Sequence, residues 1–202
     1  MSNTPVRRHP LVLRLLLAAA VAAWTGCSDA ITLPPATQAT TEHTATLYAL
    51  TGTPVGTPSA YSLLTLVATR TDRTTDFDFV FDIGPDSSFG VGTTGATVAV
   101  LLPRGAVGLG VDGGLQVSAQ PFDSLVLAPE GGYQDHAGVV IDSGVVLLAA
   151  SRRQTCNIGI LRPLYAKLRV EALDLAQRSA TLRLVVDSNC GYRGLGPGVP
   201  QR

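Results

Sequence analysis

The sequence predicts an all-β domain, specifically an antiparallel β-sandwich or a partly open barrel of short strands. Three observations favour this class. Apolar and polar residues alternate in several short segments, which is the pattern of half-buried strands. Turns rich in glycine, proline and serine separate these segments. After residue 30, no segment combines a helical apolar period with end caps.

The clearest alternation runs from Asp76 to Ile83. We expect Phe77, Phe79, Phe81 and Ile83 on a buried face, and Asp76, Asp78 and Asp82 on a solvated one. The other strand candidates are 44–50, 61–70, 96–102, 106–111, 115–119, 139–142, 145–151, 165–175 and 180–187. Hairpin turns are predicted at Gly113-Gly114, Ser143-Gly144 and 177–179, and a bulge near Leu173.

Charge is unevenly distributed along the 202 residues. Residues 28–150 hold twelve acidic and three basic side chains, whereas residues 151–202 hold nine basic and three acidic ones. We expect the two halves to pair within one fold. The basic residues are not clustered with aromatic ones, which argues against nucleic acid as a partner.

The N-terminus has the pattern of an export signal. Arg7, Arg8 and Arg14 precede an uncharged apolar stretch, 15–24, that is too short to span a bilayer. Gly26-Cys27 follows, and this ending resembles the lipobox of bacterial lipoproteins. The resemblance implies a diacylglyceryl group on Cys27 that holds the chain on a membrane.

Two alternatives to lipidation stay open. Trp24 stands where the lipobox usually has leucine, so ordinary cleavage after Ala23 is one alternative, and a free or buried Cys27 thiol is the other. With lipidation, the predicted organisation is a signal peptide (1–26), an unpacked tether (27–43), one β-domain (44–193) and a flexible tail (194–202). The predicted location is the cell envelope, at the outer membrane or its periplasmic face.

The remaining cysteines, Cys156 and Cys190, form an even pair. An exported protein meets an oxidising environment, so a disulfide between them is the simplest interpretation. Metal binding is the alternative, but neither a CxxC motif nor a nearby histidine supports it.

Motifs for catalysis or cofactor binding are not visible, so the sequence predicts no cofactor and no enzyme. His43 and His136 lack the spacing of metal ligands on a helix or strand. The row Asp76, Asp78 and Asp82 offers carboxylate oxygens to calcium, but a solvated sheet face is the commoner role for such a row.

Four segments carry a second resemblance. In order they are "DFDFVFDI", "FDSLVLAPEGGYQD", "VVLLAASR" and "YAKLRV". Together with the lipoprotein-like cysteine, this order is similar to HmuY-type haem-binding lipoproteins and their uncharacterised relatives. In that family two histidines hold the haem iron, and neither His43 nor His136 falls on a matching position.

The first functional hypothesis is therefore a lipid-anchored, non-enzymatic binding or structural module, whose partner is the membrane through Cys27 and whose protein or small-molecule ligand is unknown. The alternative is a haem or small-ligand carrier similar to the HmuY type. A hydrolase with a triad scattered along the sequence is the third hypothesis.

Overall fold

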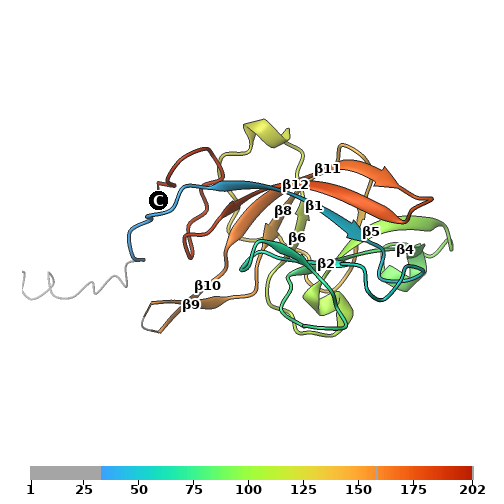
Figure 1. Cartoon of the computed structure of the whole chain (residues 1–202). Helices are drawn as coiled ribbons and strands as arrows, with labels where there is room; N and C mark the ends of the chain where they lie inside the picture. The colour runs from blue at the N-terminus through green and yellow to red at the C-terminus, as the bar shows by residue number, and fades with distance from the viewer. Residues whose placement is uncertain (1–32, 158, 202) are drawn as a thin grey trace, which may run out of the picture. The chain divides into compact units, whose positions relative to one another are not determined.

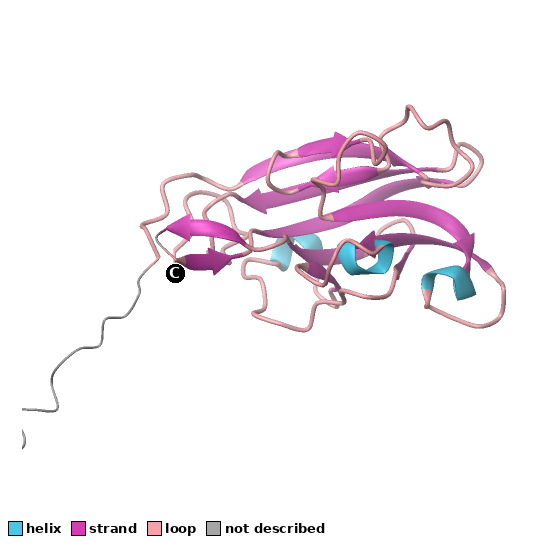
Figure 2. Cartoon of the chain, turned by 90° about the horizontal axis from the view of Figure 1, so that it is seen from below, coloured by secondary structure: helices cyan, strands magenta, loops and turns pink. Residues whose placement is uncertain are grey.

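The computed structural model describes residues 33–157 and 159–201, and within them the chain forms two antiparallel five-stranded sheets (Figures 1 and 2). Sheet A has the order β1 (Thr41–Tyr48), β12 (Ser179–Asp187), β11 (Tyr165–Asp174), β8 (Val146–Ala150), β6 (Gly114–Val117). Sheet B has the order β3 (Val67–Thr69), β2 (Ala60–Ser62), β4 (Phe79–Pro85), β5 (Thr97–Pro103), β7 (Val139–Ile141). The predicted all-β class is confirmed, and the architecture is that of a sandwich.

Smaller elements lie outside the two sheets. They are the hairpin β9 (Gln154–Asn157) and β10 (Ile160–Arg162), and the 3-10 helices η2 (Asp86–Phe89), η3 (Arg104–Val107) and η4 (Phe122–Ser124). In the described part of the chain, no helix has the length and apolar character needed to cross a membrane.

The main core lies between the two sheets, because each sheet turns one apolar face toward the other. Its largest fully buried side chains come from both sheets and include Tyr61, Phe79 and Phe81 from sheet B and Leu147, Leu168, Leu182 and Leu184 from sheet A. Tyr61 stacks on Phe79 with ring centres 5.8 Å apart. These contacts unite the sheets into one core.

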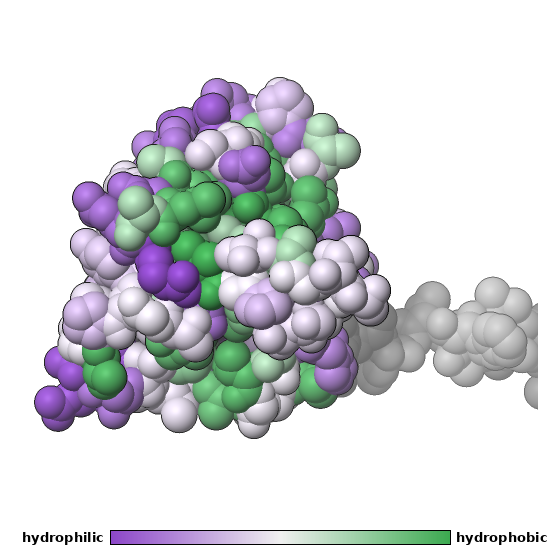
Figure 3. All heavy atoms as spheres, turned by 90° about the vertical axis from the view of Figure 1, so that its right-hand side faces the viewer, coloured by the Kyte–Doolittle hydropathy of each residue, from purple (hydrophilic) through white to green (hydrophobic). Residues whose placement is uncertain are grey.

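The β11–β12 hairpin follows the prediction closely. Its turn contains Arg178 with a positive φ of 53°, and the register shifts between Val170 and Ala172, close to the predicted bulge. At this end of the sandwich the Arg178 guanidinium donates to the main-chain oxygens of Thr51, at 3.0 Å, and Ile83, at 2.6 Å. Arg178 therefore fastens the turn to the other sheet. Figure 3 shows this end, where green apolar atoms lie among purple and white polar ones.

The prediction for residues 76–83 is wrong in two respects: both faces of β4 are buried, and Phe77 does not share the face of Phe79. Val80 is inaccessible to solvent, and it packs in a second cluster with Phe77 and Leu102. Phe77 therefore lies on the face opposite to Phe79. The segments around η2 and η3 supply partly buried apolar residues that cover this outer face of sheet B. The expected solvated face thus exists only at Asp76.

Two other strand predictions and one hairpin prediction need correction. Segment 61–70 divides into β2 and β3 around a tight turn, in which Leu66 has a φ of 60°. Segment 106–111 is not a strand: η3 and a turn occupy it, so Gly113-Gly114 does not close a hairpin there. Ser143-Gly144 joins β7 of sheet B to β8 of sheet A, so it connects the two sheets instead of forming a hairpin.

The two ends of the described chain pack together, which differs from the expected unpacked tether and flexible tail. The Asn189 side chain accepts hydrogen bonds from the main-chain nitrogens of Thr37, at 2.9 Å, and Gln38, at 3.0 Å. Thr40 N donates to Gly198 O at 3.0 Å. Leu195 is 1% exposed and belongs to an apolar cluster on the outer face of sheet A. Residues 27–32 lie outside the described residues.

The opposite charges of the two sequence halves pair, as predicted. Every ion pair that joins the halves connects a basic residue after position 150 to an acidic residue before it: Arg152–Asp76, Arg153–Asp112, Arg183–Glu42, Arg183–Asp123 and Arg193–Glu130. The uneven charge along the sequence is thus neutralised within the fold.

Candidate binding cleft

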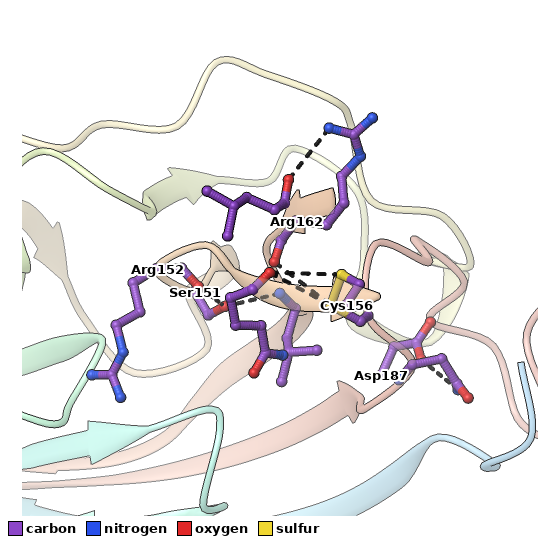
Figure 4. The surroundings of a disulfide bond; sticks show 10 residues. Ser151, Arg152, Cys156, Arg162 and Asp187 are labelled. Atoms are coloured by element: carbon purple, nitrogen blue, oxygen red, sulfur yellow. Dashed lines mark hydrogen bonds between the residues drawn. A yellow bond between two sulfur atoms is a disulfide. The ribbon is translucent and has the colours of Figure 1, made fainter. Parts of the chain in front are cut away.

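The Cys156–Cys190 disulfide is present, which confirms the predicted pairing. It joins β9 to the segment that follows β12, with Cα atoms 5.4 Å apart. Figure 4 shows Cys156 beside Arg162, on the neighbouring strand of the small hairpin. A structural disulfide indicates an oxidising compartment, and hence a chain exported from the cytoplasm. Cys27, the predicted lipidation site, lies outside the described residues.

Beside the disulfide is an open cleft of about 490 Å³. Strand β10 of the small hairpin forms one wall, and the segment after β12 forms another, with Gly191 and Arg193. The loop after η4 contributes Glu130 and Tyr133, and Ala150 and Tyr165 line the cleft from adjacent strands of sheet A. The disulfide therefore connects two walls of this cleft.

Three arginines and two carboxylates line the cleft. Arg153 pairs with Asp112 at 2.9 Å, and Arg193 pairs with Glu130 at 3.3 Å. The Arg162 side chain pairs with no carboxylate among the described residues, and the only hydrogen bond of its guanidinium there is a long one of 3.4 Å to Leu161 O. The cleft therefore carries one net positive charge, and that charge is available to a ligand.

Tyr165 offers a polar atom to the same cleft. The residue is 7% exposed, yet its hydroxyl has no hydrogen-bond partner among the described residues and is not fully enclosed. The charges that act on this hydroxyl are those of Arg193, Glu130 and Arg162, all of which line the cleft. Burial raises the pKa of Tyr165, so the hydroxyl keeps its proton and serves as a donor at neutral pH.

Two glycines allow the walls to approach closely. Gly191 has a φ of +78°, and a Cβ there would lie 2.9 Å from Cγ of Arg162. Gly113 has a φ of +89°, and its Cβ would lie 2.6 Å from the main-chain oxygen of Ala150. Larger residues at either position would be strained in this conformation and would displace a wall.

The three aspartates proposed as weak calcium candidates do not form a site. Asp76 is exposed and pairs with Arg152 at 3.2 Å. Asp78 is buried and accepts from the main-chain nitrogens of Leu63 and Arg152. Asp82 is buried and accepts from Thr51 N and Thr51 Oγ1. No group of histidine, cysteine or acidic residues in the described chain has the arrangement of a metal site.

His43 and His136, the two histidines of the described residues, lie near opposite edges of sheet A. His43 is on β1, and His136 follows Gln134, which pairs with Leu115 of β6. Four strand spacings separate β1 from β6, which amounts to roughly 19 Å. One haem iron needs both axial nitrogens within a few ångströms, so this arrangement gives no support to a bis-histidine haem site within one chain.

Neither histidine lines the cleft. His43 contacts the Thr41 hydroxyl at 2.9 Å, and His136 is exposed and contacts Asp135.

Comparison with known protein families gives no match, and comparison with curated proteins finds none either. The site must therefore be interpreted from its own chemistry.

Sequence reasoning missed Arg162, Tyr165 and Arg193 as candidate site residues. Tyr165 was noted as the first residue of a predicted strand, and Arg162 fell between two predicted strands. The one usable signal was the predicted disulfide, because it brings residues near 156 close to residues near 190.

Proposed function

We propose that this chain is an exported, lipid-anchored binding protein that holds an anionic ligand in the cleft. The observation that carries the proposal is that two hydrogen-bond donors line one cleft. Among the described residues, no carboxylate neutralises the Arg162 guanidinium, and the Tyr165 hydroxyl has no hydrogen-bond partner. Arginine and a protonated phenol both donate hydrogen bonds, so together they suit an oxygen anion.

The proposed anchor is a diacylglyceryl group on Cys27. The disulfide supports export, and the lipobox-like Gly26-Cys27 supports lipidation after a signal peptide. The envelope location, at the outer membrane or its periplasmic face, follows from that interpretation. Cys27→Ser should release the protein from membranes into the soluble exported fraction. A Cys27→Ser protein that still sediments with membranes after a carbonate wash would contradict the anchor.

The cleft is tested by nuclear magnetic resonance titration of the isotope-labelled protein. Acetate and dimethyl phosphate, each with a single negative charge, should shift the signals of residues 153, 162, 165 and 193, and glycerol should not. Arg162→Gln should weaken binding and so reduce these shifts at a given anion concentration. Arg73→Gln is the matched control, because it removes the same charge from an exposed side chain outside the cleft. Equal shifts in both variants would rule out the cleft as the anion site.

A further inference from the structure

The described chain begins beside the cleft. The Leu33 side chain lies so close to Gly191 that a Cβ on this glycine would be 3.0 Å from Leu33 Cδ1, and Gly191 lines the cleft. The neighbouring residues are fixed there as well. The Tyr192 hydroxyl donates to Pro34 O at 2.9 Å and accepts from Ala36 N at 3.1 Å. The start of the domain is therefore attached to the wall of the cleft.

Chain length then limits how far the cleft can lie from the anchor. Only residues 28–32 separate Cys27 from Leu33. A fully extended chain gains at most about 3.5 Å per residue, so Leu33 lies within about 20 Å of a lipidated Cys27. If Cys27 is lipidated as proposed, this short connection keeps the start of the domain, and the cleft beside it, within reach of the membrane surface.

The surroundings of the cleft suit that surface. Leu161 lines the cleft and is 52% exposed, and Leu127, which pairs with Gly194 of the adjacent segment, is also 52% exposed. Exposed leucines beside arginines are typical of surfaces that contact a membrane interface.

The charge of the cleft selects among anions. Arg153 and Arg193 are neutralised by Asp112 and Glu130, which leaves the single charge of Arg162. A phosphodiester carries one negative charge and matches it. A phosphate monoester carries close to two charges at neutral pH and would bring its second charge near Asp112 and Glu130.

We infer that the cleft binds the phosphodiester head group of an anionic phospholipid in the membrane that carries the lipid anchor. This inference rests on the proposed function, since it assigns the ligand of the same cleft. Arg162 supplies the charge-assisted hydrogen bonds to the phosphodiester oxygens, and the Tyr165 hydroxyl supplies another donor. The exposed leucines contact the interface beside it.

The test separates head-group binding from the anchor. The full-length Cys27→Ser protein is sedimented with vesicles of phosphatidylcholine alone or of phosphatidylcholine mixed with phosphatidylglycerol. Binding should require phosphatidylglycerol and should weaken as salt is added. Arg162→Gln should weaken it about fivefold, the usual effect of one basic residue near an anionic surface. Arg73→Gln should leave binding unchanged.

Tyr165→Phe should leave the fold intact, because the hydroxyl that it removes has no hydrogen-bond partner among the described residues. It should weaken vesicle binding severalfold without changing the unfolding midpoint. Equal binding to both vesicle types, or equal effects of Arg162→Gln and Arg73→Gln, would overturn the inference.

Two further outcomes identify the source of the anion. Shifts with soluble dimethyl phosphate but no binding to vesicles would point to a free phosphodiester, and would overturn the membrane assignment while leaving the proposed function standing. If neither the soluble anions nor the anionic vesicles bind, both the proposed function and the membrane inference are overturned.

Discussion

The Lys167 ammonium donates to the main-chain oxygen of Phe122 at 3.0 Å and lies 4.8 Å from the centre of the Phe122 ring. It also donates to Leu125 O at 2.8 Å. Lys167 is 5% exposed, on the outer face of sheet A. A buried cation thereby holds the η4 segment against this face, next to the segment that reaches the cleft.

Lys167→Met should therefore destabilise the protein by about 2 kcal/mol, because two main-chain oxygens lose a charged donor in a buried place. Denaturant unfolding measures the loss, and limited proteolysis should cut the chain near residues 118–128. Arg169→Met, an exposed change two residues along β11, should cost less than about 0.5 kcal/mol. Equal losses in both variants would show that the buried ammonium does not hold η4.

The buried strand β4 gives the second prediction. Phe79→Ala should cost about 3–5 kcal/mol, and Val80→Ala about 2 kcal/mol, because both side chains are fully buried on opposite faces. Val140→Ala, at a position that is 46% exposed on β7, should cost less than about 0.5 kcal/mol. A negligible loss for Val80→Ala in denaturant unfolding would mean that the outer face of sheet B is solvated after all.

The local pattern of β4 illustrates what a sequence can and cannot predict. Alternation located the strand and the Phe79 face correctly. The other face was assigned to solvent because Asp78 and Asp82 are charged. Their carboxylates are buried because main-chain nitrogens of distant segments, at Leu63, Arg152 and Thr51, donate to them. Such partners come from tertiary structure and leave no periodic trace in the sequence.

A third prediction concerns pH. Asp187 is fully buried, and its Oδ2 has no hydrogen-bond partner, whereas Oδ1 accepts from Asn189 N and Nδ2, each at 2.8 Å. Burial raises the pKa of Asp187 above its ordinary 3.8, although the Asn189 hydrogen bonds act in the opposite direction. The folded protein therefore holds this proton more tightly than the unfolded chain does.

The contribution of Asp187 to stability is then greatest below pH 3.8 and falls as pH rises through the raised pKa. Asp187→Asn has no such dependence. The variant should become more stable relative to the wild type as the pH rises from about 3 to about 7, as measured by urea unfolding of both proteins. If the variant instead becomes less stable relative to the wild type over this pH range, the charged form of the Asp187 carboxylate stabilises the fold.

The disulfide gives the fourth prediction. Replacing both Cys156 and Cys190 with alanine opens a loop whose ends are 34 residues apart. The chain-entropy model gives a loss of roughly 4 kcal/mol. Calorimetric or denaturant unfolding measures it. The same variant should bind dimethyl phosphate more weakly, because the disulfide joins two walls of the cleft. Unchanged stability and unchanged binding together would show that neither wall depends on the bond.

The cleft shows the limit of sequence reasoning more clearly than β4 does. Its lining comes from four separate stretches of chain, within residues 112–113, 130–133, 150–165 and 191–193. The predicted disulfide correctly brought two of them together. The loop after η4 has no regular pattern, and its place over sheet A depends on contacts such as the Lys167 hydrogen bonds. The hairpin β9–β10 is too short for its alternation to be recognised.

The central claim, that Arg162 and Tyr165 bind one anion in the cleft, is tested most directly by a double-mutant cycle. The affinity for dimethyl phosphate is measured by calorimetry in the wild type, Arg162→Gln, Tyr165→Phe and the double variant. If both side chains contact the same anion, each single change weakens binding and the two effects are coupled by about 0.5 kcal/mol or more. Full wild-type affinity in either single variant, or strictly additive losses, would contradict the claim.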